Sequence, residues 1–539
     1  MDVSRREMLK LGVGIGAGLA ALGTTGGFAF AMEGKTLKLI HHKYTQDWSP
    51  LRGGGARYFI NSLWWASPMY YDAESKLHPY VFTSWVPSEN DTVWTFKLDP
   101  KATFSDGSKI TAADVIGSWA LSAMPATKNQ RIAQVVSKIA GYDDVSRGKA
   151  RDLKGATAPD DETIVVTLSS PDPIFFMRLA NHIAPITKVS QSRGPDGDEV
   201  YNWFTPGEGA VYSGPFKLTS IDLDGGHLVM EANENFFGPK PKISRIEIDT
   251  VEDDIAAIQL LKAGTYQGHT SGMEVPTLSQ DLGQYFVGGP YIPRSQHYWF
   301  NAKRAPMNDI NVRKALVMAI DRDGLIKATA PDGPEVKADE ILFAVPGAKN
   351  TGFEPYPFDP EKARALLAES SYGGPERLPK IMFVGISNPT NEAGAQFIAE
   401  QWRQNLGITA IDMKPQADSY SGPDQNAIQI FRDDVSSPVP DPVTYLEGAI
   451  ASSSGNARRK MGGYKNEKVD ALLAEASTLS MDDPRRIALA QEAQRVFRED
   501  WMFIPWYHIA VSRSVISSVK NFDRNLNWQI VAPWNITIE

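Results

Sequence analysis

The sequence predicts a mixed α/β protein built from two or more lobes with interrupted connectivity. Its 539 residues exceed what one ordinary hydrophobic core holds. Segments with the alternation of strands and segments with the periodicity of helices follow one another, separated by loops rich in Pro and Gly. No unit of fixed length repeats along the chain. Apolar residues make up 42% and charged residues 22%, which is typical of a soluble globular protein.

The first half of the chain predicts strands around one clearly capped helix. In the stretch "TAADVIGSWALSAM", Thr111 stands at the N-cap position and Asp114 at the third helical position, as in a capping box. A second helix is expected at 251–264, where it ends at a glycine. Alternating apolar residues predict strands at 35–42, 92–100, 162–170 and 242–251, and a hairpin at 213–233 whose turn is Asp224-Gly225-Gly226.

The second half predicts a strand at 297–303 that leads into a long helix at 308–326. Val312, Leu316 and Ile320 lie on one face of that helix. Further strands are expected near 380–385 and 427–431. The remaining helices are expected at 359–369, 391–406, 466–479 and 484–499.

The N-terminal stretch has the layout of a bacterial signal peptide. Arg5 and Arg6 precede an apolar run at 11–21, and Ala29-Phe30-Ala31 forms a small-x-small cleavage site. The block "SRREMLK" resembles the twin-arginine export motif, while a Sec signal and a retained membrane anchor stay open as alternatives. Cleavage after Ala31 would release a mature chain of formal charge about -10 into the periplasm.

Composition and motifs exclude several classes of chemistry. The absence of cysteine removes disulfides, Cys-based zinc sites, iron–sulfur clusters and cysteine nucleophiles. No block rich in Lys and Arg stands out, which argues against nucleic acid as a partner. The chain also has no GxSxG elbow, no HExxH and no phosphate loop in register. We therefore expect neither a cofactor nor an enzyme.

The stretch "SWVPSENDTVWTFKLDPKATFSDGSKITAADV" at 84–115 resembles the extracellular solute-binding proteins of the dipeptide/oligopeptide/nickel class (family 5), which serve ABC importers. Four more blocks follow in family order. They are "SGPFKL…NENFFG", "FNAKRAPMNDINVRKALVMAIDR", "FDPEKARALLAES" with "GYKNEKVDALLAEA", and "IPWY". The resemblance covers the chain from about Leu37 to about Trp506. Most of these motif residues are expected to be scaffold, such as caps, turns and core positions.

The resemblance implies a periplasmic binding protein-like fold of type II, cluster C. Two main α/β lobes would be joined by a hinge and would carry an extra inserted domain. The expected domains are a discontinuous domain I at 32–65, 212–295 and 506–539, an inserted domain II at 66–211, and domain III at 296–505. The ligand would be trapped between domains I and III, which close about the hinge.

Peptide-binding relatives hold the ligand's α-ammonium with an Asp that stands shortly before the family's "DP"-type dipeptide. Here the dipeptide is Asp441-Pro442, and Pro438 occupies the ammonium-binding position. A proline cannot pair a cation, which puts simple α-peptide binding in doubt, unless a shifted alignment brings Asp433 or Asp434 into that role.

If the chain is aligned with the family at Asp441-Pro442, then Arg432, Asp434 and Ser436 are the candidate residues facing the ligand. Arg432 could grip a carboxylate or phosphate bidentately, or could instead pair with a neighbouring Asp at the surface. Because Tyr298 and Trp299 are adjacent on a strand, only one of them can face the cleft, and Trp299 is the one assigned. The remaining candidates for ligand contact are His297, Tyr44 and Arg52.

His41 and His42 suggest a metal-binding site, because some relatives bind nickel chelates. Neighbours on a strand point to opposite faces, however, and no Cys or third His is near in sequence, so we expect no metal site. The leading hypothesis is a monomeric periplasmic receptor that hands a peptide-like, opine-like or oligosaccharide solute to an inner-membrane ABC permease after export by the twin-arginine machinery. The alternatives are an exported enzyme and a partner-binding module on the same fold.

Overall fold

The computed structural model describes most of the chain after residue 34. The predicted signal peptide at 1–31 lies outside the described residues. The description begins at residue 35 and omits 42–47, 53–59, 130, 201, 208, 223, 252, 271–285, 330–335, 343–344, 346, 350–351, 353, 387–388, 416–425, 524 and 526–528.

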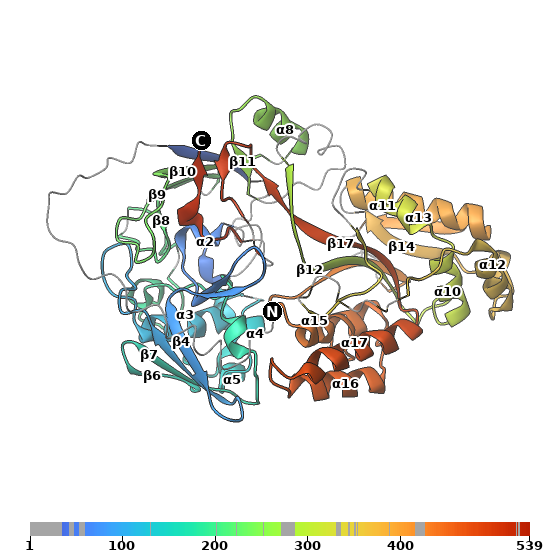
Figure 1. Cartoon of the computed structure of the whole chain (residues 1–539), viewed down its shortest axis with the longest axis horizontal. Coiled ribbons are helices and arrows are strands. Elements are labelled where there is room, and N and C mark those ends of the chain that lie inside the picture. The colour runs from blue at the N-terminus through green and yellow to red at the C-terminus, as the bar shows by residue number, and fades with distance from the viewer. Residues whose placement is uncertain are drawn as a thin grey trace.

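Two lobes, each with its own hydrophobic cluster, make up the described fold (Figure 1). The N-terminal lobe contains the first sheet, in the order β11-β1-β10-β9-β8. β1 (Thr36–His41) pairs in parallel with β10 (Arg245–Thr250) and β11 (Gly268–His269). β8 (Phe216–Asp222) and β9 (His227–Ala232) form the predicted hairpin. Helix α8 (Asp254–Lys262) follows β10, inside the predicted range 251–264.

The second sheet, β4-β5-β7-β6, lies in the segment predicted as an insertion. Its strands are β4 (Phe82–Pro87), β5 (Val93–Leu98), β6 (Ala156–Asp160) and β7 (Thr163–Thr167). Helix α3 (Ala112–Ala123) has the predicted capping box, in which the Thr111 hydroxyl accepts from the Asp114 N–H and the Asp114 carboxylate accepts from the Thr111 N–H. This segment shares one hydrophobic cluster with the first sheet rather than forming its own.

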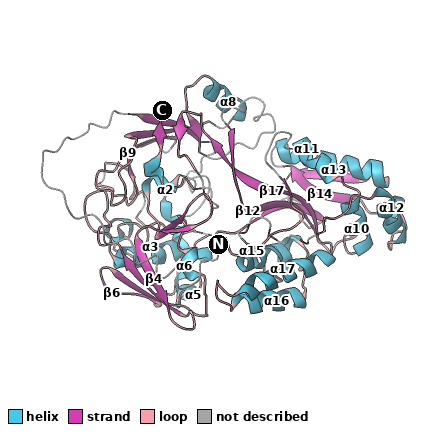
Figure 2. Cartoon of the chain, viewed as in Figure 1, coloured by secondary structure: helices cyan, strands magenta, loops and turns pink. Residues whose placement is uncertain are grey.

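The C-terminal lobe is built on a six-stranded sheet in the order β13-β17-β12-β16-β14-β15. β12 (Phe286–Phe300) lies between β16 (Ile430–Ser436) and β17 (Phe503–Ser514), antiparallel to both. β14 (Ile381–Ile386) pairs in parallel with β15 (Ile411–Pro415) and β16, and β13 (Val336–Lys337) borders β17. β12 and β17 are the longest strands described and run from this lobe toward the N-terminal lobe (Figure 2).

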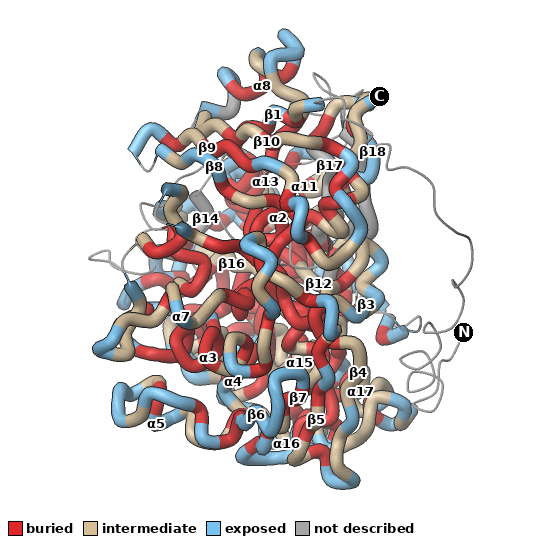
Figure 3. The backbone as a smooth tube through the Cα atoms, turned by 90° about the vertical axis from the view of Figure 1, so that its left-hand side faces the viewer, coloured by how far each residue is buried: buried red, intermediate tan, exposed pale blue. Residues whose placement is uncertain are grey.

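Helices cover both faces of this sheet (Figure 1). On one face lie α10 (Ile310–Met318), α11 (Arg322–Thr329), α12 (Pro360–Glu369) and α13 (Pro389–Leu406). On the other lie α15 (Pro442–Ile450), α16 (Glu467–Ser477) and α17 (Pro484–Glu499). Buried residues run through the middle of the molecule, and the exposed ones lie mostly at its outer turns (Figure 3). The sheet is therefore sandwiched between two helical layers, as an α/β lobe requires.

The prediction of a single helix over 308–326 is wrong, because α10 ends at Met318 and α11 begins at Arg322. Asp321 causes the break, since its Oδ1 accepts from the N–H groups of Asp323 and Gly324 and so starts a new helix. The strand predicted at 427–431 lies further along the chain, at 430–436.

The N-terminal lobe is completed by the end of the chain after β17. The Ile516 N–H donates to the Gln267 carbonyl at 2.8 Å, and Val515 bridges Gly268, so β17 leads directly into the first sheet. The two lobes are thus joined through β12 and β17, the arrangement of a two-stranded hinge. None of the described helices is both long enough and apolar enough to cross a bilayer.

The remaining described elements are short. They are η1 (Pro50–Arg52), α2 (Asn61–Trp64), β2 (Met69–Tyr71), β3 (Leu77–Pro79), η3 (Pro125–Thr127), α4 (Ala133–Val136), α5 (Tyr142–Ser146), α6 (Phe175–Arg178), α7 (Val189–Ser192), η4 (Pro375–Arg377), the π-helix η5 (Asn456–Lys460), β18 (Val519–Lys520), η6 (Pro533–Asn535) and β19 (Thr537–Ile538).

Candidate functional site

The register of β12 against β16 places the predicted ligand residues on one face of the sheet. Arg432 stands opposite Tyr298, Asp434 opposite Gln296, and Ser436 opposite Arg294. Alternate residues of a strand share a face, so Arg432, Asp434 and Ser436 point the same way. The sequence predicted them at the end of a strand and in the following loop, but β16 continues to Ser436 and contains all three.

Asp434 is held by a cation that the sequence analysis missed. The Arg294 Nε donates to Asp434 Oδ2 at 2.5 Å, and both side chains are only about a quarter exposed, at 27% and 23%. Burial alone would raise the pKa of Asp434, but the charges of Arg294 and Arg432 hold it below its usual value. The carboxylate therefore stays ionised between two guanidinium groups.

Asp433, on the opposite face of β16, is paired as well. It forms an ion pair with Lys460, which lies at the end of η5 and is 8% exposed. The positive charge of Arg432 acts on Lys460 from close by, adding to the effect of burial in lowering the lysine's pKa. Among the described residues this group thus contains three cations, Arg294, Arg432 and Lys460, and two carboxylates.

The loop after β16 brings the dipeptide Asp441-Pro442 into the start of α15. Asp441 is fully buried, and its oxygens accept from Arg486 Nε and Nη2 at 2.8 and 2.9 Å. It also caps α15 through the Thr444 N–H at 2.8 Å. Asp433, Asp434 and Asp441 are therefore all neutralised by cations of the protein, and the residue at the expected ammonium position is Pro438.

His297 belongs to a buried polar chain beneath the sheet. Its Nε2 lies 2.6 Å from the Ser295 hydroxyl, which lies 3.1 Å from the Tyr445 hydroxyl, and Tyr445 donates to the Val435 carbonyl at 3.1 Å. Burial lowers the pKa of His297 well below its usual value, so the ring is neutral. Because His297 is 0% exposed and packs edge-on against Trp299 and Phe503, we assign it a structural role.

Trp299 is also a core residue, and it is not retained among the ligand contacts. It is 0% exposed and packs against Phe503 and Phe497, the latter on α17. Trp299 is buried because a layer of helices covers this face of the sheet. Tyr298, on the other face, is equally buried and stacks on Trp506.

Arg52 is held within the N-terminal lobe. Its Nε donates to Glu199 Oε2 at 2.9 Å, and Glu199 also accepts from the Ser49 hydroxyl and from Trp203 Nε1. Tyr44 lies outside the described residues.

Two side chains on β12 that the sequence analysis did not assign face the Arg432 group. Gln296 Oε1 and the Tyr298 hydroxyl are buried, and neither has a hydrogen-bond partner among the described residues. In the strand register Gln296 stands opposite Asp434, and Tyr298 stands opposite Arg432. The only sequence signal for them was their alternate spacing at 294, 296 and 298, which cannot be interpreted until the partner strand is known.

At the C-terminal end of β1, the His41 Nδ1 lies within hydrogen-bond distance of the Thr270 hydroxyl, and His42 lies outside the described residues. No group of three or more His, Cys, Asp and Glu side chains suited to a metal ion occurs in the part of the chain that the structure describes.

Comparison with known proteins gives a family match over most of the chain. The model of the bacterial extracellular solute-binding proteins, family 5 (middle), matches residues 76–457. The periplasmic oligopeptide-binding protein OppA of Salmonella typhimurium is 26% identical over 457 residues, which are 82% of this chain and 81% of the relative. The periplasmic murein peptide-binding protein MppA of Escherichia coli is 24% identical over 470 residues, 84% of this chain and 83% of the relative.

Solved structures show the same fold. NikA from Brucella suis, in complex with Fe(III)-EDTA, superposes with a TM-score of 0.76 at 20% identity, covering 94% of this chain and 100% of that one. The Escherichia coli murein tripeptide-binding protein MppA gives a TM-score of 0.74 at 22% identity, covering 94% and 99%. The predicted type II binding-protein fold is confirmed.

Proposed function

Since the chain belongs to family 5 of the bacterial extracellular solute-binding proteins, we propose that it captures a small solute between its two lobes and delivers it to an inner-membrane ABC permease. The relatives named above are binding proteins, two of them for peptides. The protein would act as a monomer in the periplasm after the twin-arginine machinery exports it and residues 1–31 are removed. The domain boundaries expected from the sequence remain part of this proposal.

The charges around Arg432 indicate which class of solute the protein binds. Three cations and two carboxylates leave this group with an excess of positive charge, and Asp433, Asp434 and Asp441 already have cationic partners. Among the described residues of this group a free α-ammonium would meet no unpaired carboxylate, whereas a carboxylate could accept from Arg432. The solute is therefore an acid, either peptide-like with a masked amino terminus or opine-like, rather than a neutral oligosaccharide.

Substitution of Arg432 tests the assignment. Arg432→Ala removes a charged hydrogen-bond donor, which contributes about 1.5–3 kcal/mol and so corresponds to roughly 10- to 100-fold in affinity. Arg432→Lys keeps the charge but loses the bidentate fork, and it should retain part of the affinity. The control is Arg495→Ala, because Arg495 is half exposed on α17 and pairs only with neighbours on its own helix.

The ligand for this test is first identified by mass spectrometry of solute retained by the natively purified protein, and affinities are then measured by calorimetry. Equal affinities of the wild type and Arg432→Ala would overturn the role of Arg432. A folded protein whose melting temperature does not shift with acidic peptides or opine-like conjugates would favour the partner-binding alternative, since a bound ligand stabilises the folded state by mass action.

A further inference from the structure

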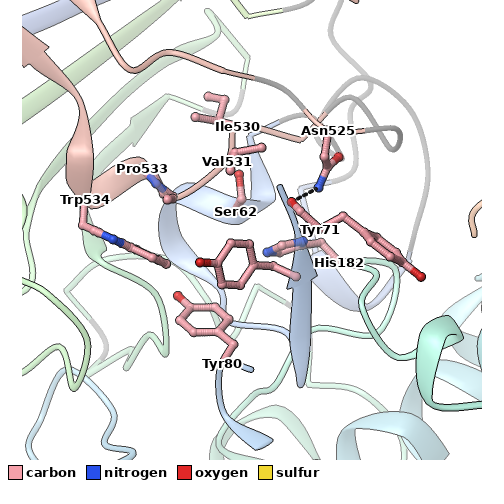
Figure 4. Close-up of a pocket in the computed structure, with 11 residues that line it drawn as sticks. Ser62, Tyr71, Tyr80, His182, Asn525, Ile530, Val531, Pro533 and Trp534 are labelled. Atoms are coloured by element: carbon pink, nitrogen blue, oxygen red, sulfur yellow. Dashed lines mark hydrogen bonds between the residues drawn. The ribbon is translucent and has the colours of Figure 1, made fainter. Parts of the chain in front are cut away.

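A small cavity lies where the end of the chain folds back onto the N-terminal lobe (Figure 4). Its volume is about 10 Å³. Ser62 of α2, the tyrosines of β2, Tyr80 and His182 line one side, and residues 530–534 of the C-terminal segment line the other. The Asn525 Nδ2 donates to the Tyr71 carbonyl at 3.2 Å beside it, the bond drawn dashed in Figure 4.

Three polar atoms that belong to the lining of this cavity lack hydrogen-bond partners among the described residues. They are the Ser62 hydroxyl, the Tyr80 hydroxyl and the Nδ1 of His182. Ser62 and His182 are each 3% exposed, so bulk water does not satisfy them. Buried polar atoms in native proteins nearly always have a partner, because an unpaired one loses its hydration without compensation. Three such atoms around one hollow therefore point to a missing partner.

The volume and polarity of the cavity indicate what the missing hydrogen-bond partner is. A volume of about 10 Å³ matches one water molecule, which needs roughly 10–15 Å³ and typically makes about three hydrogen bonds. Burial lowers the pKa of His182 to about 4, opposed by the Gln529 side chain, so the ring is neutral and can donate or accept. Two hydroxyls and a neutral imidazole carry no charge that would require an ion.

We propose that this cavity holds one buried water molecule that bridges Ser62 Oγ, the Tyr80 hydroxyl and His182 Nδ1. The three residues come from separate segments of the N-terminal lobe, and the C-terminal segment covers the water. Trp534, which packs on Tyr70 and Tyr80 and is 7% exposed, closes the cavity from that segment. The water is then part of how the last segment of the chain joins the first sheet.

The direction in which one substitution changes the stability of the protein tests the proposal. With the water present, Tyr80→Phe deletes a satisfied hydrogen bond and should increase the unfolding equilibrium constant about fivefold, measured by urea unfolding of the mature chain. In a dry cavity the same substitution removes an unpaired hydroxyl, so stability would stay unchanged or rise, and that result would overturn the proposal. Tyr142→Phe, at a half-buried tyrosine of α5 away from the cavity, is the matched control and should change nothing.

A double-substitution cycle and a crystal structure complete the test. If one water joins Ser62 and Tyr80, then Ser62→Ala and Tyr80→Phe should be non-additive, because each alters a molecule that the other binds. Strict additivity would count against a shared water. In a crystal structure that resolves ordered solvent, a density peak within hydrogen-bond distance of all three atoms is expected. Clear density for the three side chains with no peak between them would overturn the proposal.

Discussion

Val439 links the two lobes, and its truncation should weaken ligand binding from outside the ligand site. It follows β16 in the C-terminal lobe, yet it is 0% exposed and packs in the hydrophobic cluster of the N-terminal lobe. Opening about the hinge would expose it. Val439→Ala removes two carbon atoms, and at about 0.8 kcal/mol per buried CH₂ the closed form loses about 1.6 kcal/mol relative to the open form.

Ligand that binds the closed form should then bind roughly tenfold more weakly, because the population of the binding-competent state falls by that factor. Calorimetry with the retained solute measures the affinity. Val443→Ala is the control, since Val443 is equally buried but packs within the C-terminal lobe, on α15. It should lower stability and leave affinity unchanged. Equal affinity losses in both variants, or none in Val439→Ala, would refute the reasoning.

Three further predictions concern stability. Arg486→Ala leaves the buried Asp441 carboxylate unpaired and should destabilise the protein by about 3–5 kcal/mol in urea unfolding, whereas Arg485→Ala, at an exposed neighbour, should have little effect. Thr111→Ala removes the cap of α3 and should cost about 1 kcal/mol, while Thr111→Ser should restore most of it. The native state keeps His182 neutral down to a pKa of about 4, while the unfolded chain protonates it near 6.5, so stability should fall by about 3 kcal/mol as pH drops from 6.5 to 4. His182→Gln should flatten that part of the pH profile, and a profile as steep as that of the wild type would contradict the assignment.

Local signals predicted much of the fold. The capping box at Thr111 and Asp114 and the Asp-Gly-Gly turn of the β8–β9 hairpin depend on neighbours in the sequence, and both are confirmed. The helix break at Asp321 was missed because a run of helix-forming residues continues through it, and only the side-chain bonds of Asp321 show the second start. The strand predicted at 427–431 ended five residues too early, because Arg432-Asp433-Asp434 interrupts the apolar pattern of β16.

The candidate site was predictable only in part. The sequence placed Arg432, Asp434 and Ser436 at the end of a strand and in the loop after it, whereas all three lie on one face of β16, as the two-residue period of a strand requires. Arg294, the partner of Asp434, and Lys460, the partner of Asp433, lie on other elements of the chain, and the strand register and the path of η5 that bring them close are tertiary properties. Trp299 was assigned to the cleft because a strand has two faces, but helices cover both faces of this sheet.

The central claim is that the protein binds an acidic solute through the positively charged group around Arg432. Mass spectrometry of the small molecule released on denaturing the natively purified protein tests this claim most directly. The account predicts a single solute that carries a carboxylate and no free α-ammonium at the end that meets β16. Retention of a neutral solute, or of a free peptide whose binding is abolished by acetylation of its amino terminus, would contradict the claim.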